Sequence, residues 1–262
     1  GTAEETERDV ELMCADLGIH YKKIDVSRRV GEEGVYDPLA VRLSLVSAFI
    51  NKWLIVGYES LFGETAFEAM LRRGEGISAV QRVVYELCVG PNAKAFNKKH
   101  QLRREVLERY ASDRNLLPLC AANKSERMVG WFIHNGIDDM PVSPLGNLYK
   151  TQVYDLAAYY HIPQEIINKD PSPDFMPGLR DDLAMGRIPY ETIDLVLVGI
   201  EKGLSDEQMM VEGITGKHIR RVRRMMELSE WMRREPLCAP HFDSLGEGGQ
   251  DVQPKNRLCP SK

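Results

Sequence analysis

Two charged side chains in the middle of the 262-residue sequence have the type and placement that phosphate chemistry requires. Glu126 ends a polar segment, 123–126, that follows the short apolar run 116–122. Such a run predicts a buried strand, so the carboxylate would lie at its carboxyl end, where it could hold Mg²⁺. Lys150 falls in the first turn of a predicted helix, where its charge and the backbone N–H groups suit a phosphate. A solvated carboxylate or salt bridge at Glu126, and an ordinary surface lysine at 150, are the alternatives.

Ser172 is a third candidate, because it lies between Pro171 and Pro173 in a loop that these prolines stiffen. Its hydroxyl is a small donor that could contact a phosphate oxygen. A serine that caps a turn is the alternative interpretation.

These motifs, in this order, resemble the ammonia-dependent NAD synthetases of the ATP-pyrophosphatase superfamily. The resemblance covers most of residues 97–236. Its matching residues are Asn123-Lys124-Ser125-Glu126, Gly130, Pro144, Leu148-Tyr149-Lys150-Thr151-Gln152-Val153, Pro171-Ser172, Gly178, Asp181-Asp182, Gly186, Tyr190 and Asp194. The individual motifs are short, but their shared order makes the resemblance specific.

The resemblance implies roles for individual residues. Glu126 and Lys150 would be catalytic, with Glu126 as the ligand of Mg²⁺. Asn123, Lys150 and Ser172 would bind ATP. The residues that it implies for the acceptor substrate are Asn97, Arg103, His134, Asp139, Asp181 and Arg233.

The implied reaction forms an amide from ATP, ammonia and a carboxylate, which is deamido-NAD in the family. The carboxylate attacks the α-phosphate of ATP, pyrophosphate leaves, and ammonia then displaces AMP from the acyl-adenylate. The protein would contribute positioning and charge neutralisation, with Mg²⁺ at Glu126 and Lys150 on the phosphates. The family is homodimeric, so a homodimer is expected.

Several positions depart from the family's pattern. Its arginine, threonine, aspartate and histidine are replaced here, respectively, by Gln101, Ala121, Pro141 and Met232. Each lost polar contact is worth about 1–3 kcal/mol of discrimination, so we expect a weak response to deamido-NAD. His134, Arg233 and either Asp138 or Asp139 could compensate in part. A related ligase with a different acceptor, and a non-catalytic nucleotide-binding or scaffold protein, are the alternatives.

The family's phosphate-binding loop, a Ser-Gly-Gly-x-Asp-Ser pattern after its first strand, does not occur in these 262 residues. Residues 4–26 resemble the family's second helix and third strand, which places the loop upstream. A sheet without its central strand would leave the neighbouring edges unpaired. We therefore expect this sequence to begin downstream of the loop, whereas a genuine absence of the loop would favour the scaffold alternative.

The fold that must position these residues is expected to be α/β, a mostly parallel sheet with helices on both faces. The resemblance makes it adenine nucleotide alpha-hydrolase-like. Apolar periodicity predicts strands at 19–26 and 116–122 and helices at 4–17, 38–50, 96–111, 148–160, 190–201 and 216–233. Residues 53–90 hold further apolar helical material, for which packing is preferred to a lid or a dimer surface. Residues 1–240 are expected to form one domain and 241–262 a poorly ordered tail.

Composition is that of an ordinary globular protein, with 43% hydrophobic and 28% charged residues. The net charge of -5 argues against nucleic acid as a partner, and the basic stretch 217–234 is interpreted as a solvated helix face rather than a helix-turn-helix. No apolar run is long enough to span a bilayer, so no membrane partner is expected. The five scattered cysteines lack metal-ligand spacing and predict reduced thiols in the cytoplasm.

Overall fold

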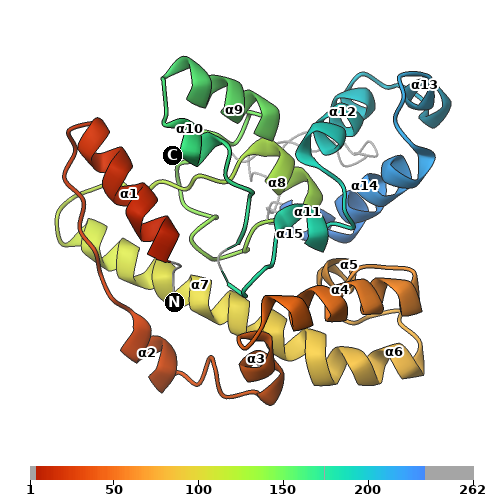
Figure 1. Cartoon of the computed structure of the whole chain (residues 1–262), viewed down its shortest axis with the longest axis horizontal. Helices are drawn as coiled ribbons and strands as arrows, with labels where there is room; N and C mark the ends of the chain where they lie inside the picture. The colour runs from red at the N-terminus through yellow and green to blue at the C-terminus, as the bar shows by residue number, and fades with distance from the viewer. Residues whose placement is uncertain (1–3, 174, 234–262) are drawn as a thin grey trace, which may run out of the picture.

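The computed structural model describes residues 4–173 and 175–233, whose regular elements are helices joined by loops (Figure 1). In chain order these are α1 (Glu4–Asp16), α2 (Ser27–Glu32), α3 (Leu39–Ser44), α4 (Ala48–Phe62), α5 (Ala66–Leu71), α6 (Ala79–Val84), the π-helix η1 (Tyr85–Val89), α7 (Gly90–Ser112), α8 (Lys124–Val129), α9 (Lys150–Tyr159), α10 (Gln164–Ile167), α11 (Asp181–Ala184), α12 (Tyr190–Glu201), α13 (Asp206–Val211), α14 (Gly216–Leu228) and α15 (Glu230–Arg233). The long helix α7 crosses the molecule, with α1 on one side of it and α2 and α3 on the other (Figure 1). No helix in this part of the chain is both long and apolar enough to cross a membrane. The predicted tail at 241–262 lies outside the described residues.

Most of the predicted helices are present, with small changes at their ends. The predictions at 4–17, 96–111, 148–160 and 190–201 correspond to α1, α7, α9 and α12. The predicted helix at 38–50 is wrong, because α3 ends at Ser44 and α4 begins at Ala48. The Ser44 carbonyl accepts a hydrogen bond from the side-chain amide of Asn51 at 2.6 Å. That side-chain bond satisfies a carbonyl at the end of α3, so the chain can turn there.

The predicted strands at 19–26 and 116–122 are not regular strands in the described residues. The second forms one isolated parallel bridge, between Leu119 and Val142. The N–H of Cys120 donates to the Val142 carbonyl at 2.9 Å. An apolar run predicts extended backbone, but a ladder also needs a neighbouring strand in register. The predicted sheet is therefore not confirmed, and the segment leads into the helix α8, which was not predicted.

The largest hydrophobic cluster lies where α12 and α14 pack together and against α5 and α8. Helix α14 contributes Ile219, Val222 and Met225, which are fully buried. Their spacing of three residues places them on one helix face. The predicted helix at 216–233 is interrupted between α14 and α15 by the buried Ser229.

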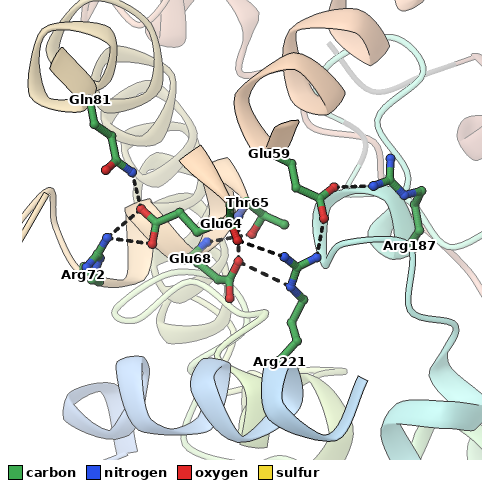
Figure 2. A network of polar contacts seen from close by, with 9 residues as sticks. Glu59, Glu64, Thr65, Glu68, Arg72, Gln81, Arg187 and Arg221 are labelled. Carbon is green, nitrogen blue, oxygen red and sulfur yellow. Dashed lines mark hydrogen bonds and ion pairs between the residues drawn. The ribbon is translucent and has the colours of Figure 1, made fainter. Parts of the chain in front are cut away.

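Buried ion pairs attach α4 and α5 to this core (Figure 2). Glu59, on α4, accepts hydrogen bonds from Arg221 on α14 and, at 2.7 Å, from Arg187. Nε of Arg221 also lies 3.6 Å from a carboxylate oxygen of Glu68 on α5. The side chains of Glu59 and Arg221 are each 9% exposed. Because burying unpaired charges is costly, these contacts favour one placement of α4 and α5 on α14.

Glu64, between α4 and α5, connects neighbouring helices of this part of the chain to one another (Figure 2). Its two carboxylate oxygens accept hydrogen bonds from one nitrogen of Arg72 at 2.7 and 2.6 Å. The side-chain amide of Gln81, on α6, donates to Glu64 and also to the Tyr58 hydroxyl, the latter at 3.1 Å. Helices α4, α5 and α6 are thus held together as one unit.

Gly130, at the end of α8, should not tolerate a side chain. Its φ is +81°, and a Cβ there would lie 2.3 Å from Cβ of Ser229. We expect Gly130→Ala to lower the free energy of unfolding by about 3 kcal/mol, from backbone strain and overpacking together. Gly18→Ala is the matched control, because Gly18 has a φ of +63° with nothing within 4 Å. The free energy of unfolding of Gly18→Ala, measured by urea denaturation, should fall by about 1 kcal/mol. Equal losses in the two variants would show that the contact with Ser229 is unimportant.

Candidate active site

A cavity of about 540 Å³ lies between α5, α7, α8, the loop after α8, the start of α9, and helices α11 and α15. Seven of the residues predicted to form the site line it: Glu126, Lys150, Ser172, Asn97, Arg103, His134 and Asp181. They come from segments far apart in the sequence, so the fold brings the two predicted halves of the site into one space.

Glu126 is fixed by the first turn of α8. Its carboxylate accepts the Asn123 N–H at 3.1 Å, while the Asn123 side chain accepts the Glu126 N–H at 3.0 Å. This reciprocal capping explains why Asn123 is 2% exposed and does not line the cavity. The other carboxylate oxygen of Glu126 accepts a hydrogen bond from Nζ of Lys150 at 3.1 Å.

Lys150 is a mostly buried cation that stays charged. Burial alone lowers the pKa of this ammonium group, but attraction to Glu126 outweighs burial and raises the pKa above its ordinary value. The backbone at Lys150 is held by Ser125, whose hydroxyl accepts the Lys150 N–H at 2.9 Å. Asp194, from α12, accepts both the Ser125 hydroxyl and, at 2.8 Å, the Thr151 N–H. Asp194 therefore positions the start of α9 without lining the cavity.

Asp181 presents a buried carboxylate to the cavity. One oxygen accepts the Tyr190 hydroxyl at 2.8 Å, and the other is a buried acceptor with no hydrogen-bond partner among the described residues. Burial raises the pKa of Asp181 to about 6, and the charge of Glu126 adds to that rise, while the Tyr190 hydroxyl, the charge of Lys150 and the Trp131 side chain oppose it. The arrangement leaves one oxygen suited to accept a hydrogen bond from a ligand.

One face of α7 lines another side of the cavity with Asn97, His100, Gln101 and Arg103. His100 was not predicted, although its spacing of three residues from both Asn97 and Arg103 could have indicated it. Burial lowers the pKa of His100 to about 3, with further lowering from Arg103 and Lys99. Nδ1 of His100 lies 3.7 Å from a carboxylate oxygen of Asp138, too far for a hydrogen bond. At neutral pH the imidazole is uncharged, so this contact is not an ion pair.

Asp139 and Arg233 lie outside the lining of the cavity. Asp139 faces Nδ1 of His134 at 3.3 Å and accepts the Asn135 N–H at 3.0 Å. The Arg233 guanidinium donates to the carbonyl of Met128 at 2.8 Å and to that of Met226 at 2.7 Å. These carbonyls belong to the ends of α8 and α14, so Arg233 satisfies helix termini instead of pointing at a ligand.

Part of the wall comes from residues that the sequence did not indicate. Phe67 and Arg73, from α5 and the turn after it, line the cavity together with Trp231 of α15. The rings of Phe67 and Trp131 pack edge to face with centroids 4.7 Å apart. No local motif marks these residues, because their place in the wall depends on how α4 and α5 dock on α14.

The sequence of this chain is similar to a known protein family and to several of its members. A family model described as NAD synthase matches residues 77–236. The NH(3)-dependent NAD(+) synthetase of Thermotoga maritima is 27% identical over 236 residues, covering 89% of this chain and 77% of that protein. The enzyme of the same description from Coprothermobacter proteolyticus is 40% identical over 111 residues, covering 42% of this chain and 37% of that protein.

Two solved structures share the fold. The NMN synthetase of Francisella tularensis superposes with a TM-score of 0.58 at 20% identity, covering 92% of this chain and 75% of that one. The NH3-dependent NAD synthetase of Campylobacter jejuni superposes with a TM-score of 0.54 at 19% identity, covering 91% and 74%. The helices of this chain are therefore arranged as in these two proteins.

Proposed function

This chain belongs to the NAD synthase family, and on that premise we propose that it is an ATP-dependent ligase that adenylates a carboxylate and transfers ammonia to it. The relatives named above point to deamido-NAD as the acceptor. The observation that carries the proposal is the partly buried Glu126–Lys150 pair, which shares a cavity with the oxygen of Asp181 that no described residue satisfies. A charged lysine and carboxylates of this kind suit a site that handles phosphates and an acyl group.

Lys150 would act on the phosphates of ATP. Its Nζ keeps a positive charge and is held at 3.1 Å from Glu126, so it is placed before substrate arrives. As the acceptor carboxylate attacks the α-phosphate, negative charge passes to the departing pyrophosphate, and a preorganised cation stabilises that charge. We propose that Ser172, in the proline-stiffened loop at the cavity, also contacts ATP.

Mg²⁺ fits the donor set around Glu126. This ion is commonly held by one or two carboxylates together with substrate phosphates and water, so a cage of several protein ligands is not required. Within residues 4–173 and 175–233 there is no group of three or more histidine, cysteine or acidic side chains that could hold a metal ion. Each carboxylate oxygen of Glu126 accepts one hydrogen bond and retains a lone pair. When bound there, Mg²⁺ would neutralise phosphate charge.

Asp181 would serve the second half of the reaction. Ammonia attacks the acyl carbon of the adenylate, AMP leaves, and one proton must be removed from nitrogen. The oxygen of Asp181 that no described residue satisfies can accept a hydrogen bond from that nitrogen, and the carboxylate can then take up the proton that the nitrogen loses. We place Asn97 and Arg103, on the cavity face of α7, on the acceptor side.

A second candidate is the same reaction on a smaller carboxylate. Gln101 and Met232 line the cavity where the family resemblance gives an arginine and a histidine. Neither can supply a positive charge to a phosphate, so the site is poorer in contacts for a dinucleotide. Deamido-NMN, with a single phosphate, would need fewer of them.

The test is amide formation by the full-length protein. ATP, Mg²⁺ and ammonium are supplied with deamido-NAD, with deamido-NMN or with no acceptor, and pyrophosphate and the amide are both measured. We expect one pyrophosphate per amide, and no amide when ammonium is omitted. Faster turnover of deamido-NMN would favour the second candidate. If no acceptor stimulates pyrophosphate release although ATP binds, the chain would be a nucleotide-binding protein and not a ligase.

We also propose that the helices flank a mostly parallel sheet of the adenine nucleotide alpha-hydrolase-like kind, supported by the bridge at Leu119 and Val142. We propose a homodimer, supported by exposed apolar side chains on α4, among them Trp53 at 64% and Leu61 at 78% exposure. A cytoplasmic location is supported by the free cysteines of the described residues. Light scattering of the full-length protein at micromolar concentration tests the dimer, and a monomer mass would contradict it.

A further inference from the structure

The turn after α5 has an unusual residue at its most constrained position. The Arg73 N–H donates to the Met70 carbonyl at 2.9 Å, and the Gly74 N–H donates to the Ala69 carbonyl at 3.1 Å. These two bonds define a Schellman motif, in which the residue at position 73 must be left-handed and is usually glycine. Here that residue is Arg73, with a φ of +56°. An arginine in this conformation is strained, which indicates that its side chain has a use beyond ending the helix.

The side chain of Arg73 stacks on an aromatic ring at the cavity. Its guanidinium carbon lies 3.6 Å from the centroid of Trp231. The ring is held in turn, because its N–H donates to the Leu71 carbonyl at 3.1 Å and His134 packs edge-on against it. Stacking uses the flat face of the guanidinium and leaves its N–H donors at the edge for a planar or tetrahedral anion.

Among the residues that the structure describes, no carboxylate pairs with the charge of Arg73. Two other cations line the cavity, Arg103 on α7 and Lys150, and Lys150 is paired with Glu126. No acidic side chain within the described ranges forms an ion pair or hydrogen bond with the Arg73 guanidinium. A cation that lines the wall of a substrate cavity without a partner attracts an anionic ligand group.

We propose that Arg73 binds a phosphate of the acceptor substrate and is a specificity-determining residue of this protein. The inference rests on the proposed ligase function. Arg73 lies outside the residues 77–236 that the family model matches, in the segment that α4 and α5 form. It would supply the positive charge that Gln101 lacks, from a different side of the same cavity.

Arg73→Gly separates this role from a structural one. Glycine relieves the left-handed strain, so the variant should melt within a few degrees of the wild type, while the loss of the charge should raise KM for the phosphorylated acceptor about tenfold or more. KM for ATP and kcat should change by less than about threefold. Arg73→Lys keeps the charge but not the planar donors, so its KM for the acceptor should lie between those of the wild type and Arg73→Gly. Asn115→Gly is the matched control, because Asn115 also has a positive φ, of +52°, and does not line the cavity.

Binding without turnover tests Arg73 even if the ligase proposal fails. Deamido-NMN is titrated into the ATP-free protein, and the fluorescence of its tryptophans is followed for the wild type, Arg73→Gly and Asn115→Gly. Binding that is weakened about tenfold only in Arg73→Gly supports the inference, whatever the activity. Normal amide formation with an unchanged KM in Arg73→Gly overturns it and leaves the function intact. If the wild type neither binds nor turns over deamido-NMN or deamido-NAD, both proposals are wrong.

Discussion

Replacing Lys150 with methionine should lower kcat/KM for pyrophosphate release by a factor of about a hundred to a thousand. Lys150 is the charged group held beside Glu126 in the cavity, and removing one preorganised donor to developing charge has an effect of this size. Because the interaction would be stronger in the transition state than in the ground state, kcat should fall more than KM for ATP rises. Steady-state assays with saturating ammonium and acceptor measure both.

Lys124→Met is the matched control for that experiment. Lys124 lies in α8 beside the same site, but its ammonium group pairs with Glu201 at 2.6 Å and does not line the cavity. It should keep kcat/KM within about threefold of the wild type, since an exposed ion pair contributes little. Thermal melts of both variants check that Glu126, left without its cation, has not unfolded the site. A Lys150→Met variant with activity within tenfold of the wild type would remove this residue from the mechanism.

His100→Leu should make the protein less sensitive to acid. The imidazole has a pKa of about 3 when folded because it is buried and faces Lys99 and Arg103. The unfolded chain binds a proton there below about pH 6.5, whereas the folded protein does not until about pH 3. The stability that depends on a neutral His100 is therefore complete above pH 6.5 and is lost as the pH falls toward 3. This difference in proton binding lowers the free energy of unfolding by about 4 kcal/mol as the pH falls over that range.

The measurement is the free energy of urea unfolding between pH 3.5 and 7.5. The slope of stability against pH should be smaller in His100→Leu than in the wild type, and unchanged in His20→Leu, where the histidine is exposed. Asp181 acts in the opposite sense between about pH 4 and 6, because its raised pKa makes the folded protein keep a proton that the unfolded chain has released. Comparing variant with wild type cancels that contribution. Parallel curves for wild type and His100→Leu would contradict the prediction.

The groups that the sequence indicated well are those fixed by local structure. Glu126 and Lys150 each belong to a helix start whose capping groups lie within a few residues or in the next motif, so their surroundings follow from short segments. Helix α14 was predicted for the same reason, because its apolar period alone decides which face is buried. These elements follow mainly from their own segments, although Asp194 of α12 also holds the start of α9.

What the sequence could not indicate depends on contacts between distant segments. Residues 116–122 have the apolarity of a strand, but only Leu119 meets a partner backbone, at Val142. Arg233 occupies a position where the resemblance implies a substrate contact, yet nearby helix ends take its donors. Arg73 reaches the cavity because the α4–α5 unit is docked on α14, and that docking is decided by partners more than a hundred residues away.

The docking of α4 and α5 also determines how the site should respond to heat. Charged groups lose hydration free energy as temperature rises, so keeping Glu59, Glu68 and Arg221 out of water costs less in a hot protein than in a cold one. Apolar burial has no comparable gain, because its contribution per unit area levels off. The wall that carries Arg73 should therefore loosen later on heating than the apolar packing around α12. Amide hydrogen exchange in α5 and α12 at increasing temperature would reveal the order in which the two parts open.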